Sequence, residues 1–243
     1  MIKQVRPTYE VSVGAGFFCV IENREGNTIT YEEDVWRMDT IRTLNITPTV
    51  NEGQIWASGT LFEHIVQITG AEITTDVVAL PSKLLNQLMG AKELNGFTLS
   101  RTNDLEKEFA FGYWGENRDG TLVFYWHPVC KIAPSEETKE TRNEDTPDPE
   151  KSYTITVIPF GDGEEGGLWH LKYEQKEAIE KGLVPLNIEQ FFTRPIFTEQ
   201  QIEDLTTTQP TPSTTPPTVP TPTPTTPPST LVPPQTFEEE TEE

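Results

Sequence analysis

The stretch KEFAFGYWGENRDGTLVFYWHPVCKI, residues 107–132, decides the fold class of this 243-residue chain. Two runs rich in aromatic and β-branched residues flank the turn ENRDGT, whose Asp119-Gly120 pair is a strong signal for a β-hairpin. Both runs alternate with a period of two, as strands do. In the first run Phe109, Phe111 and Tyr113 share a face opposite Glu108, Ala110 and Gly112; in the second Leu122, Phe124 and Trp126 alternate with Thr121, Val123 and Tyr125.

Strand-like runs continue on both sides of this hairpin. They span residues 16–22, 28–33, 40–50, 59–68, 70–80 and 152–160. In the run 70–80, Glu72, Thr74 and Asp76 alternate with Ile73, Val77 and Ala79. Such alternation is typical of sheets packed on one face and solvated or partnered on the other. The chain is therefore predicted to be mainly β, an antiparallel β-sandwich or barrel.

One short helix is predicted within VVALPSKLLNQLMG, residues 77–90. Pro81 suits the first helical position, and Gly90 suits the position just after a helix, where the backbone is often left-handed. Because a helix this short does not persist alone in water, we expect it to dock on the sheets. The side chains expected to dock, at helical spacing, are Leu84, Leu85 and Leu88.

Two weaker helix signals span residues 174–182 and 198–205, the second with a capping box of Thr198 and Gln201. At residue 206 the composition changes, and Pro and Thr dominate up to an acidic end. Such a chain stays extended and solvated. We therefore expect a folded domain over 1–205 and a disordered Pro/Thr-rich tail over 206–243. The polar stretch 134–150 is predicted to be a long solvated loop.

Acidic residues outnumber basic ones, with 39 Asp and Glu against 18 Lys and Arg and a net charge of −21. Adhesion to nucleic acid needs basic patches that displace counterions from phosphates. The composition therefore argues against a protein that binds DNA or RNA tightly. It does not argue against a channel through which DNA passes, because an acidic wall repels the phosphate backbone.

Cys19 and Cys130 lie in apolar runs and are predicted to be buried free thiols. The uncharged run VSVGAGFFCVI, residues 11–21, resembles part of a signal peptide, but Glu10 interrupts the approach and no cleavage site follows. We interpret Gly16 to Ile21 within this run as a buried strand. No stretch is long enough to cross a membrane, so we expect a soluble protein made in the cytoplasm.

The sequence shows no motif that carries chemistry. The three histidines, His64, His127 and His170, lack metal-ligand spacing, and no nucleophile elbow, phosphate-binding loop or CxxC motif is present. The acidic turn GDGEEGG, residues 161–167, lacks the ligand register of an EF-hand. We expect no catalytic residue, no metal and no cofactor, and therefore no enzymatic activity.

Five tryptophans leave one alternative open: Trp36, Trp56, Trp114, Trp126 and Trp169. Exposed aromatic rings can form a carbohydrate-binding platform, which would suit a secreted β-sandwich module with a Pro/Thr linker. Core and subunit-interface positions are the favoured interpretation, because interfaces are enriched in Trp and Tyr.

The order of the segments is more specific than any one motif. The stretches that carry it are GFFCVIENREGNTITYEEDVWRMDTIRTLNITPTV (16–50), NEGQIWASGTLFEHIVQITGAEITTDVVALPSKLLNQLMGAK (51–92), FAFGYWGENRDGTLVFYWHPVCKIAP (109–134), ETKETRNEDTPDPEKSYTITVIPF (137–160) and QFFTRPIF (190–197). This ordered set resembles the major tail tube proteins of bacteriophages with long, non-contractile tails. The segment 176–190 and the Pro/Thr tail lie outside the resemblance.

The resemblance implies two antiparallel sheets with one flanking helix, and it implies that residues 190–197 form the closing strand. The subunits would form stacked, hexameric rings. Strands of the subunits would close an inner β-barrel around the tape-measure protein, and DNA would later pass through this lumen without specific binding. Tail terminator and distal tail or baseplate proteins would be the other partners, and the virion tail the location. We expect inter-ring contacts from a loop over 49–59, through Asn51, Glu52, Gln54 and Trp56, and a lumen lined by Glu72, Thr74 and Asp76.

Overall fold

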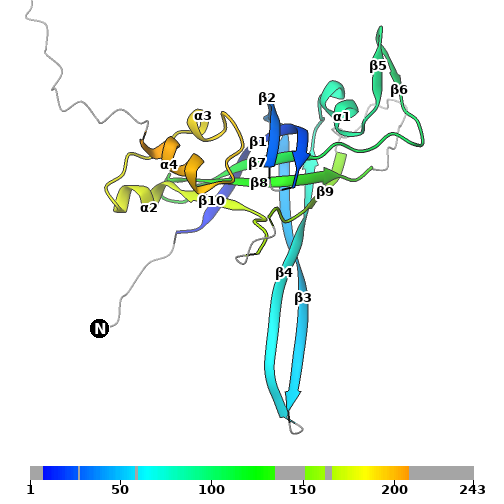
Figure 1. The fold of residues 1–243 in the computed structure, drawn as a ribbon. Coiled ribbons are helices and arrows are strands. Elements are labelled where there is room, and N and C mark those ends of the chain that lie inside the picture. The colour runs from blue at the N-terminus through cyan, green and yellow to red at the C-terminus, as the bar shows by residue number, and fades with distance from the viewer. Residues whose placement is uncertain (1–7, 27, 58–59, 135–150, 162–165, 208–243) are drawn as a thin grey trace, which may run out of the picture. The chain divides into compact units, whose positions relative to one another are not determined.

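A computed structural model describes residues 8–26, 28–57, 60–134, 151–161 and 166–207, which lie in the first of the chain's two units, Met1–Gln209. Figure 1 shows the elements in space. In chain order they are β1 (Glu10–Glu25), β2 (Thr28–Met38), β3 (Ile41–Ala57), β4 (Thr60–Val77), α1 (Ser82–Leu88), β5 (Lys92–Leu94), β6 (Phe97–Leu99), β7 (Phe109–Asn117), β8 (Leu122–Ile132), β9 (Lys151–Val157), β10 (Leu171–Glu174), α2 (Gln175–Glu180), α3 (Ile188–Phe191) and α4 (Glu199–Thr207). The fold is mainly β, as the alternating sequence pattern predicts.

One antiparallel sheet contains all the strands except the β5–β6 pair. Its order is β2-β1-β7-β8-β9-β4-β3, with β10 added against β8. Strand β8 belongs to both halves of this sheet, because residues 123–126 pair with β10 and residues 130–132 pair with β9. The β2-β1-β7 half and the β9-β4-β3 half thus share β8, and the outermost strands, β2 and β3, each leave one edge without a partner strand in the described part of the chain.

The first hydrophobic core lies between the two halves of the sheet. Phe18 of β1 and Phe111 of β7 contribute from one half, and Ile73 of β4 and Ile155 of β9 from the other. Because buried side chains of both halves meet in one cluster, the sheet folds over on itself in the manner of a sandwich. Helix α1 packs against the same cluster.

Helix α1 docks as the leucine spacing predicts. Leu84 and Leu88 are fully buried in the first core, and Leu85 is partly buried against it. The helix begins one residue later than expected, since Pro81 is its N-cap and not its first helical residue. Gly90 has φ = +71°, and a Cβ there would lie 2.3 Å from the carbonyl oxygen of Leu105, so only glycine fits this stop.

A second core covers the other face of the β1-β7-β8 region. Phe124 and Trp126 of β8 pack with Leu186, Phe191 and Phe192 from the segment that follows α2. The alternating faces predicted for residues 107–132 are confirmed, but neither face of this hairpin is left to solvent. The covering segment lies partly in 176–190, outside the family resemblance.

Two expectations about the C-terminal part are confirmed and one is wrong. Helices α2 and α4 occupy the two weaker helix signals, and Gln201 and Thr198 exchange hydrogen bonds as a capping box. The stretch 190–197, expected as a closing strand, is not a strand, because Phe191 and Phe192 both point into the second core. Adjacent residues of a strand point to opposite faces.

Both cysteines are free and buried, as predicted. Burial raises the pKa of the Cys19 thiol to about 12, with a smaller contribution from Glu32 and Asp34, and burial also raises the pKa of the Cys130 thiol. Thiols that stay protonated are poor nucleophiles. Both side chains therefore act as small apolar core residues. The expected loop residues 135–150 and tail residues 208–243 lie outside the described residues.

Candidate assembly interface

Strands β3 and β4 form a hairpin, and in the described part of the chain no third strand pairs with its outer part. We call residues 50–68 the arm. Strand β4 pairs with β9 over Ala71–Val77 only, whereas its pairing with β3 continues to the end of the hairpin at Ala57 and Thr60. At about 3.3 Å per residue, the β3 side of the arm, residues 50–57, is about 26 Å long. Figure 1 shows the hairpin projecting away from the rest of the sheet.

The expected loop over 49–59 is instead mostly strand. Asn51, Glu52, Gln54 and Trp56 all lie on β3 and pair with β4. Glu52, Gln54 and Trp56 share one face of the arm, and Asn51 lies on the other, because side chains alternate along a strand. All four side chains are exposed, so the residues expected to make contacts are accessible.

Large apolar side chains are exposed on both faces of the arm. Trp56 is 62% exposed and Phe62 is 74% exposed, whereas Trp126 in the second core is 0% exposed. The other exposed apolar residues of the arm are Val50, Ile55, Ile65, Val66 and Ile68. An isolated two-stranded hairpin is marginally stable in water, and contiguous exposed apolar surface marks an interaction site. The arm therefore has the composition of an interface, and none of the described residues of the chain covers it.

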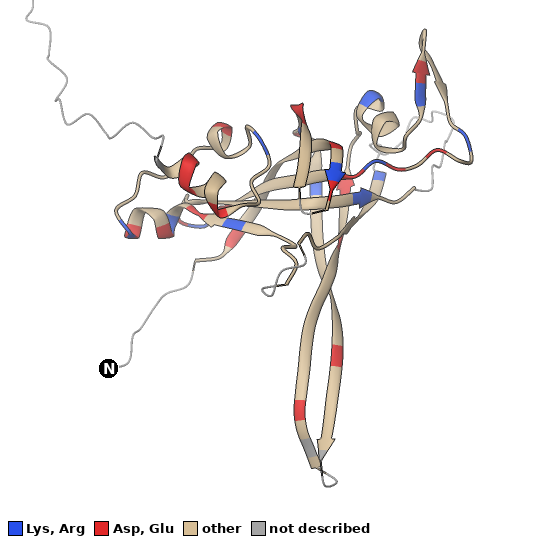
Figure 2. Cartoon of the chain, in the orientation of Figure 1, with Lys and Arg blue, Asp and Glu red and all other residues tan. Residues whose placement is uncertain are grey.

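The arm carries acidic groups and no Lys or Arg. Its ionisable residues are Glu52, Glu63 and His64, with Nε2 of His64 lying 3.6 Å from a carboxylate oxygen of Glu52. Figure 2 shows the arm as a largely uncharged element with two acidic positions. Its interactions must therefore be dominated by apolar contact, with a negative charge that favours a basic partner surface.

A polar face spans strands β3, β4 and β9. Glu72, Thr74 and Asp76 point to it, confirming their shared face, while Ile73 and Val77 point to the first core. The expectation for Ala79 is wrong, because β4 ends at Val77 and Ala79 is exposed.

Pairing extends this face across the neighbouring strands, since residues directly opposite in a ladder share a face. The paired residues are Thr43, Asn45 and Thr47 of β3 and Ser152, Thr154 and Thr156 of β9. Hydrogen bonds from Thr43 and then Ser152 hold the pKa of Asp76 below its ordinary value, so the carboxylate stays ionised. Every residue of the face is at least partly exposed.

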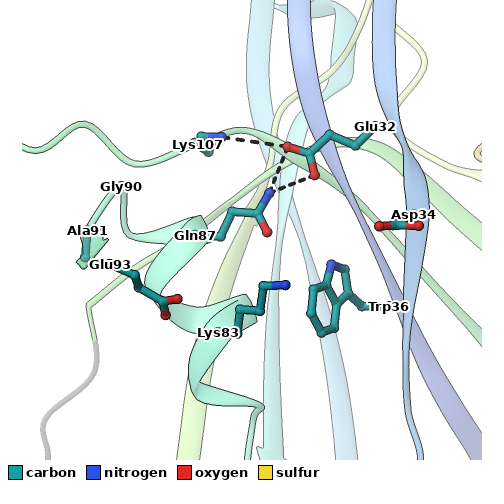
Figure 3. A pocket seen from close by; sticks show the side chains of 9 residues that line it. All are labelled: Glu32, Asp34, Trp36, Lys83, Gln87, Gly90, Ala91, Glu93 and Lys107. Carbon is teal, nitrogen blue, oxygen red and sulfur yellow. Dashed lines mark hydrogen bonds and ion pairs between the residues drawn. The ribbon is translucent and has the colours of Figure 1, made fainter. Parts of the chain in front are cut away.

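A groove of about 370 Å³ separates α1 from β2 (Figure 3). Nε2 of Gln87 donates to both carboxylate oxygens of Glu32, at 2.8 and 2.7 Å, and Nζ of Lys107 lies 3.8 Å from the same carboxylate. Nζ of Lys83 lies 5.6 Å from the centre of the Trp36 ring, a cation–π contact. These contacts attach the helix to the sheet edge.

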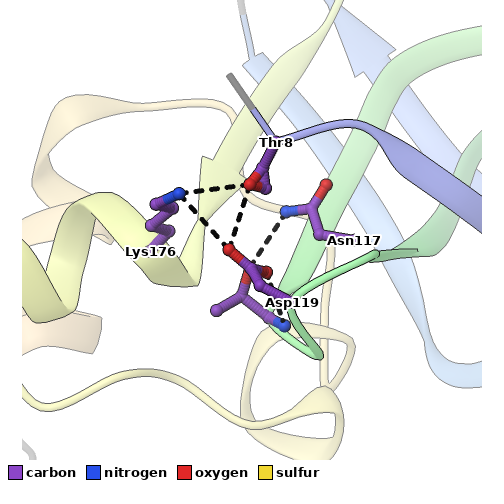
Figure 4. A network of polar contacts seen from close by, with 5 residues as sticks. Thr8, Asn117, Asp119 and Lys176 are labelled. Atoms are coloured by element: carbon purple, nitrogen blue, oxygen red, sulfur yellow. Dashed lines mark hydrogen bonds and ion pairs between the residues drawn. The ribbon is translucent and has the colours of Figure 1, made fainter. Parts of the chain in front are cut away.

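The β7–β8 turn forms as the Asp119-Gly120 signal predicts, with Gly120 at φ = +81°. Asp119 accepts hydrogen bonds from the backbone N and Oγ1 of Thr121 and from Oγ1 of Thr8, and it lies 3.3 Å from Nζ of Lys176 (Figure 4). These contacts, led by the Thr121 hydroxyl, lower the pKa of Asp119. The network fixes Thr8 and α2 to the turn.

The structure brings two of the three histidines close together, with the ring centres of His127 and His170 6.3 Å apart. His127 is buried, with Nδ1 at 3.0 Å from the carbonyl oxygen of Trp169, and burial lowers its pKa to about 4. His64 lies on the exposed arm. Among the described residues no group of three or more His, Cys, Asp or Glu side chains could hold a metal ion. Nor does this part of the chain contain a helix long and apolar enough to span a membrane.

The tryptophans are likewise dispersed among different environments. Trp56 is exposed on the arm, Trp126 is fully buried, and Trp36, Trp114 and Trp169 are partly buried. Comparison of the chain with protein-family models and with curated protein sequences gives no significant match.

Proposed function

We propose that the chain is a structural subunit of a bacteriophage tail tube that assembles as stacked, hexameric rings around a tape-measure protein. The arm is the observation that carries this proposal. All its described side chains are exposed, and they include large apolar groups that a solvated monomer leaves in contact with water. A second copy that covers them stabilises the assembly.

The open sheet supports the same proposal. Among the described residues, no strand pairs with the outer edge of β2 or of β3, and a ring of copies that pair through these edges would leave neither exposed. The acidic residues Glu32, Glu33 and Asp34 lie along β2 and limit indiscriminate pairing of that edge.

The polar face is the best candidate for the lumen. Its hydroxyl and amide groups keep a channel wetted, and Glu72 and Asp76 make it acidic. A duplex that moves through such a channel meets repulsion from Glu72 and Asp76. Pairing also places Lys131 of β8 opposite Thr156, but its Nζ lies 3.7 Å from a carboxylate oxygen of Glu108, which offsets its charge. The proposed end partners are the tail terminator and the distal tail or baseplate proteins, and the proposed location is the virion.

Electron microscopy and sedimentation of the purified chain test the proposal. We expect hollow tubes or rings from the wild-type chain. A variant in which Asn-Gly replaces residues 50–68 should keep the thermal unfolding of the body but remain monomeric. A wild-type chain that sediments only as a monomer at every protein and salt concentration would remove the proposal.

Assembled tubes allow a second test of the lumen. The double variant Glu72→Lys/Asp76→Lys should retain a short DNA duplex that wild-type tubes exclude. The matched control reverses Glu177 and Glu180 on α2, away from the polar face, and should behave as wild type. Equal retention by both variants would contradict the assignment of this face.

A further inference from the structure

The β5–β6 hairpin exposes a second apolar surface. Phe97 is 73% exposed and Leu105, just beyond the hairpin, is 84% exposed. Leu94 and Leu99 are exposed as well. The turn is formed by Asn95 and Gly96, both with positive φ, which is the conformation that a two-residue hairpin turn requires.

Hydrogen bonds to α1 determine which face of this hairpin points outward. Nδ2 of Asn86 donates to Oε1 of Glu93 at 2.7 Å and to Oγ1 of Thr98 at 3.0 Å. Glu93 and Thr98 are directly opposite in the ladder and therefore share the face toward α1. The opposite face, which points away from the helix, is formed by the pairs Lys92 with Leu99 and Leu94 with Phe97. We call it the β5–β6 face.

The arm and the β5–β6 face lie toward opposite ends of β4. The outer end of the arm lies at the start of β4, at Thr60. Helix α1 and the β5–β6 hairpin follow the other end of β4, at Val77 (Figure 1). Surfaces at opposite ends of one strand cannot meet within one copy. They meet when copies follow one another along the direction of β4, as a head-to-tail contact.

Charge also matches the two surfaces. The arm has Glu52 and Glu63 and no Lys or Arg. The segment 82–107 carries four basic residues (Lys83, Lys92, Arg101 and Lys107) against three acidic ones (Glu93, Asp104 and Glu106), in a chain with a net charge of −21. Lys92 lies on the β5–β6 face itself. An acidic apolar arm therefore meets a locally basic apolar surface.

We propose that the β5–β6 face receives the arm of a second copy and is the inter-ring contact surface. This inference rests on the proposed assembly into stacked rings, and it names the surface that the arm contacts. It makes the contact heterologous: each copy gives its arm to one neighbour and receives the arm of another, so the stack can extend indefinitely.

Photo-cross-linking in assembled tubes tests the inference. Phe97 is replaced by p-benzoyl-phenylalanine, tubes are verified by electron microscopy before irradiation, and cross-linked peptides are located by mass spectrometry. We expect cross-links to residues 50–68 of a second copy. The same group at Leu183, an exposed position near α2, should not reach the arm.

A pair of substitutions gives an independent readout. Leu94→Ser/Phe97→Ser should raise the protein concentration needed for tube formation about tenfold or more, because exposed apolar anchors dominate contact energies. The control Leu183→Ser/Val184→Ser removes a comparable exposed apolar pair and should leave that concentration unchanged.

The outcomes separate this inference from the proposed function. The proposed contact would be overturned if the benzoyl-phenylalanine at position 97 cross-linked to residues outside 50–68, or if tubes formed equally well with both serine pairs. Either result would leave the proposed tube assembly standing. Wild-type chains that never form rings or tubes would remove both.

Discussion

The arm and the β7–β8 hairpin are rich in the same types of residue but lie in opposite environments. Both are antiparallel pairs with aromatic and β-branched side chains on two faces. In β7–β8 one face meets the first core and the other meets residues 186–196, so Phe111 and Trp126 are fully buried. In the arm, no described segment of the chain covers either face. The difference shows that the sequence of an apolar strand pair does not reveal which segment buries it. That segment can belong to the same chain or to another copy.

The largest expected effect is a difference in stability between the alanine variants of two tryptophans, Trp126 and Trp56. Trp126→Ala should lower the free energy of unfolding by about 3–5 kcal/mol, because it leaves a cavity in the second core. Trp56→Ala should change the same quantity by less than about 0.5 kcal/mol, since its ring is exposed, yet it should impair assembly. Urea unfolding of the dilute proteins measures both. Equal destabilisation would mean that the arm is part of the body's fold.

A pH dependence of stability should come from His127 in the second strand of the β7–β8 hairpin. Burial lowers the pKa of His127 to about 4 from an ordinary 6.5, so the unfolded chain binds this proton first as the pH falls. The stabilising contribution of neutral His127 is fully present above pH 6.5. It is lost progressively toward pH 4, by on the order of 3 kcal/mol.

Urea unfolding between pH 7 and pH 4 checks this dependence. The variant His127→Phe should show a smaller loss of stability on acidification than the wild-type chain does. A slope that persists in His127→Phe would assign the effect to other groups.

A smaller difference in stability is expected between alanine substitutions at two glycines, Gly112 in the body and Gly53 on the arm. In Gly112→Ala the new Cβ would lie 2.8 Å from ring atoms of Phe192 and Trp126, in a packed core, and should cost about 1–3 kcal/mol. In Gly53→Ala on the arm the nearest atom is 3.9 Å away, and the change should be neutral or stabilise by about 0.5 kcal/mol. Thermal unfolding of both variants measures the contrast. A large loss at Gly53 would mean that its environment is already packed.

Local signals in the sequence were sufficient for several elements. The Asp119-Gly120 pair predicted the β7–β8 turn, and Pro81 with the leucine spacing predicted α1. Thr198 and Gln201 predicted the start of α4. Each prediction depends on residues adjacent in sequence, whose backbone preferences hold wherever the segment packs.

Features that depend on distant contacts could not be predicted in the same way. The family resemblance implied a loop over 49–59, but β3 continues through this segment as an edge strand, where Pro48 is tolerated. The stretch 190–197 looked strand-like, yet the capping box of Asn187 and Gln190 starts α3 there. Nothing in the β7–β8 sequence indicated that residues 186–196 would cover it.

Hydrogen exchange of the arm amides tests the central claim most directly. At a concentration where sedimentation gives a monomer, the amides of residues 50–68 should exchange much faster than those of β7 and β8, because only one strand pair protects them. In assembled material the arm amides should become protected, while those of β7 and β8 change little. Arm amides as protected in the dilute monomer as those of the β7–β8 hairpin would contradict an arm that needs a second copy.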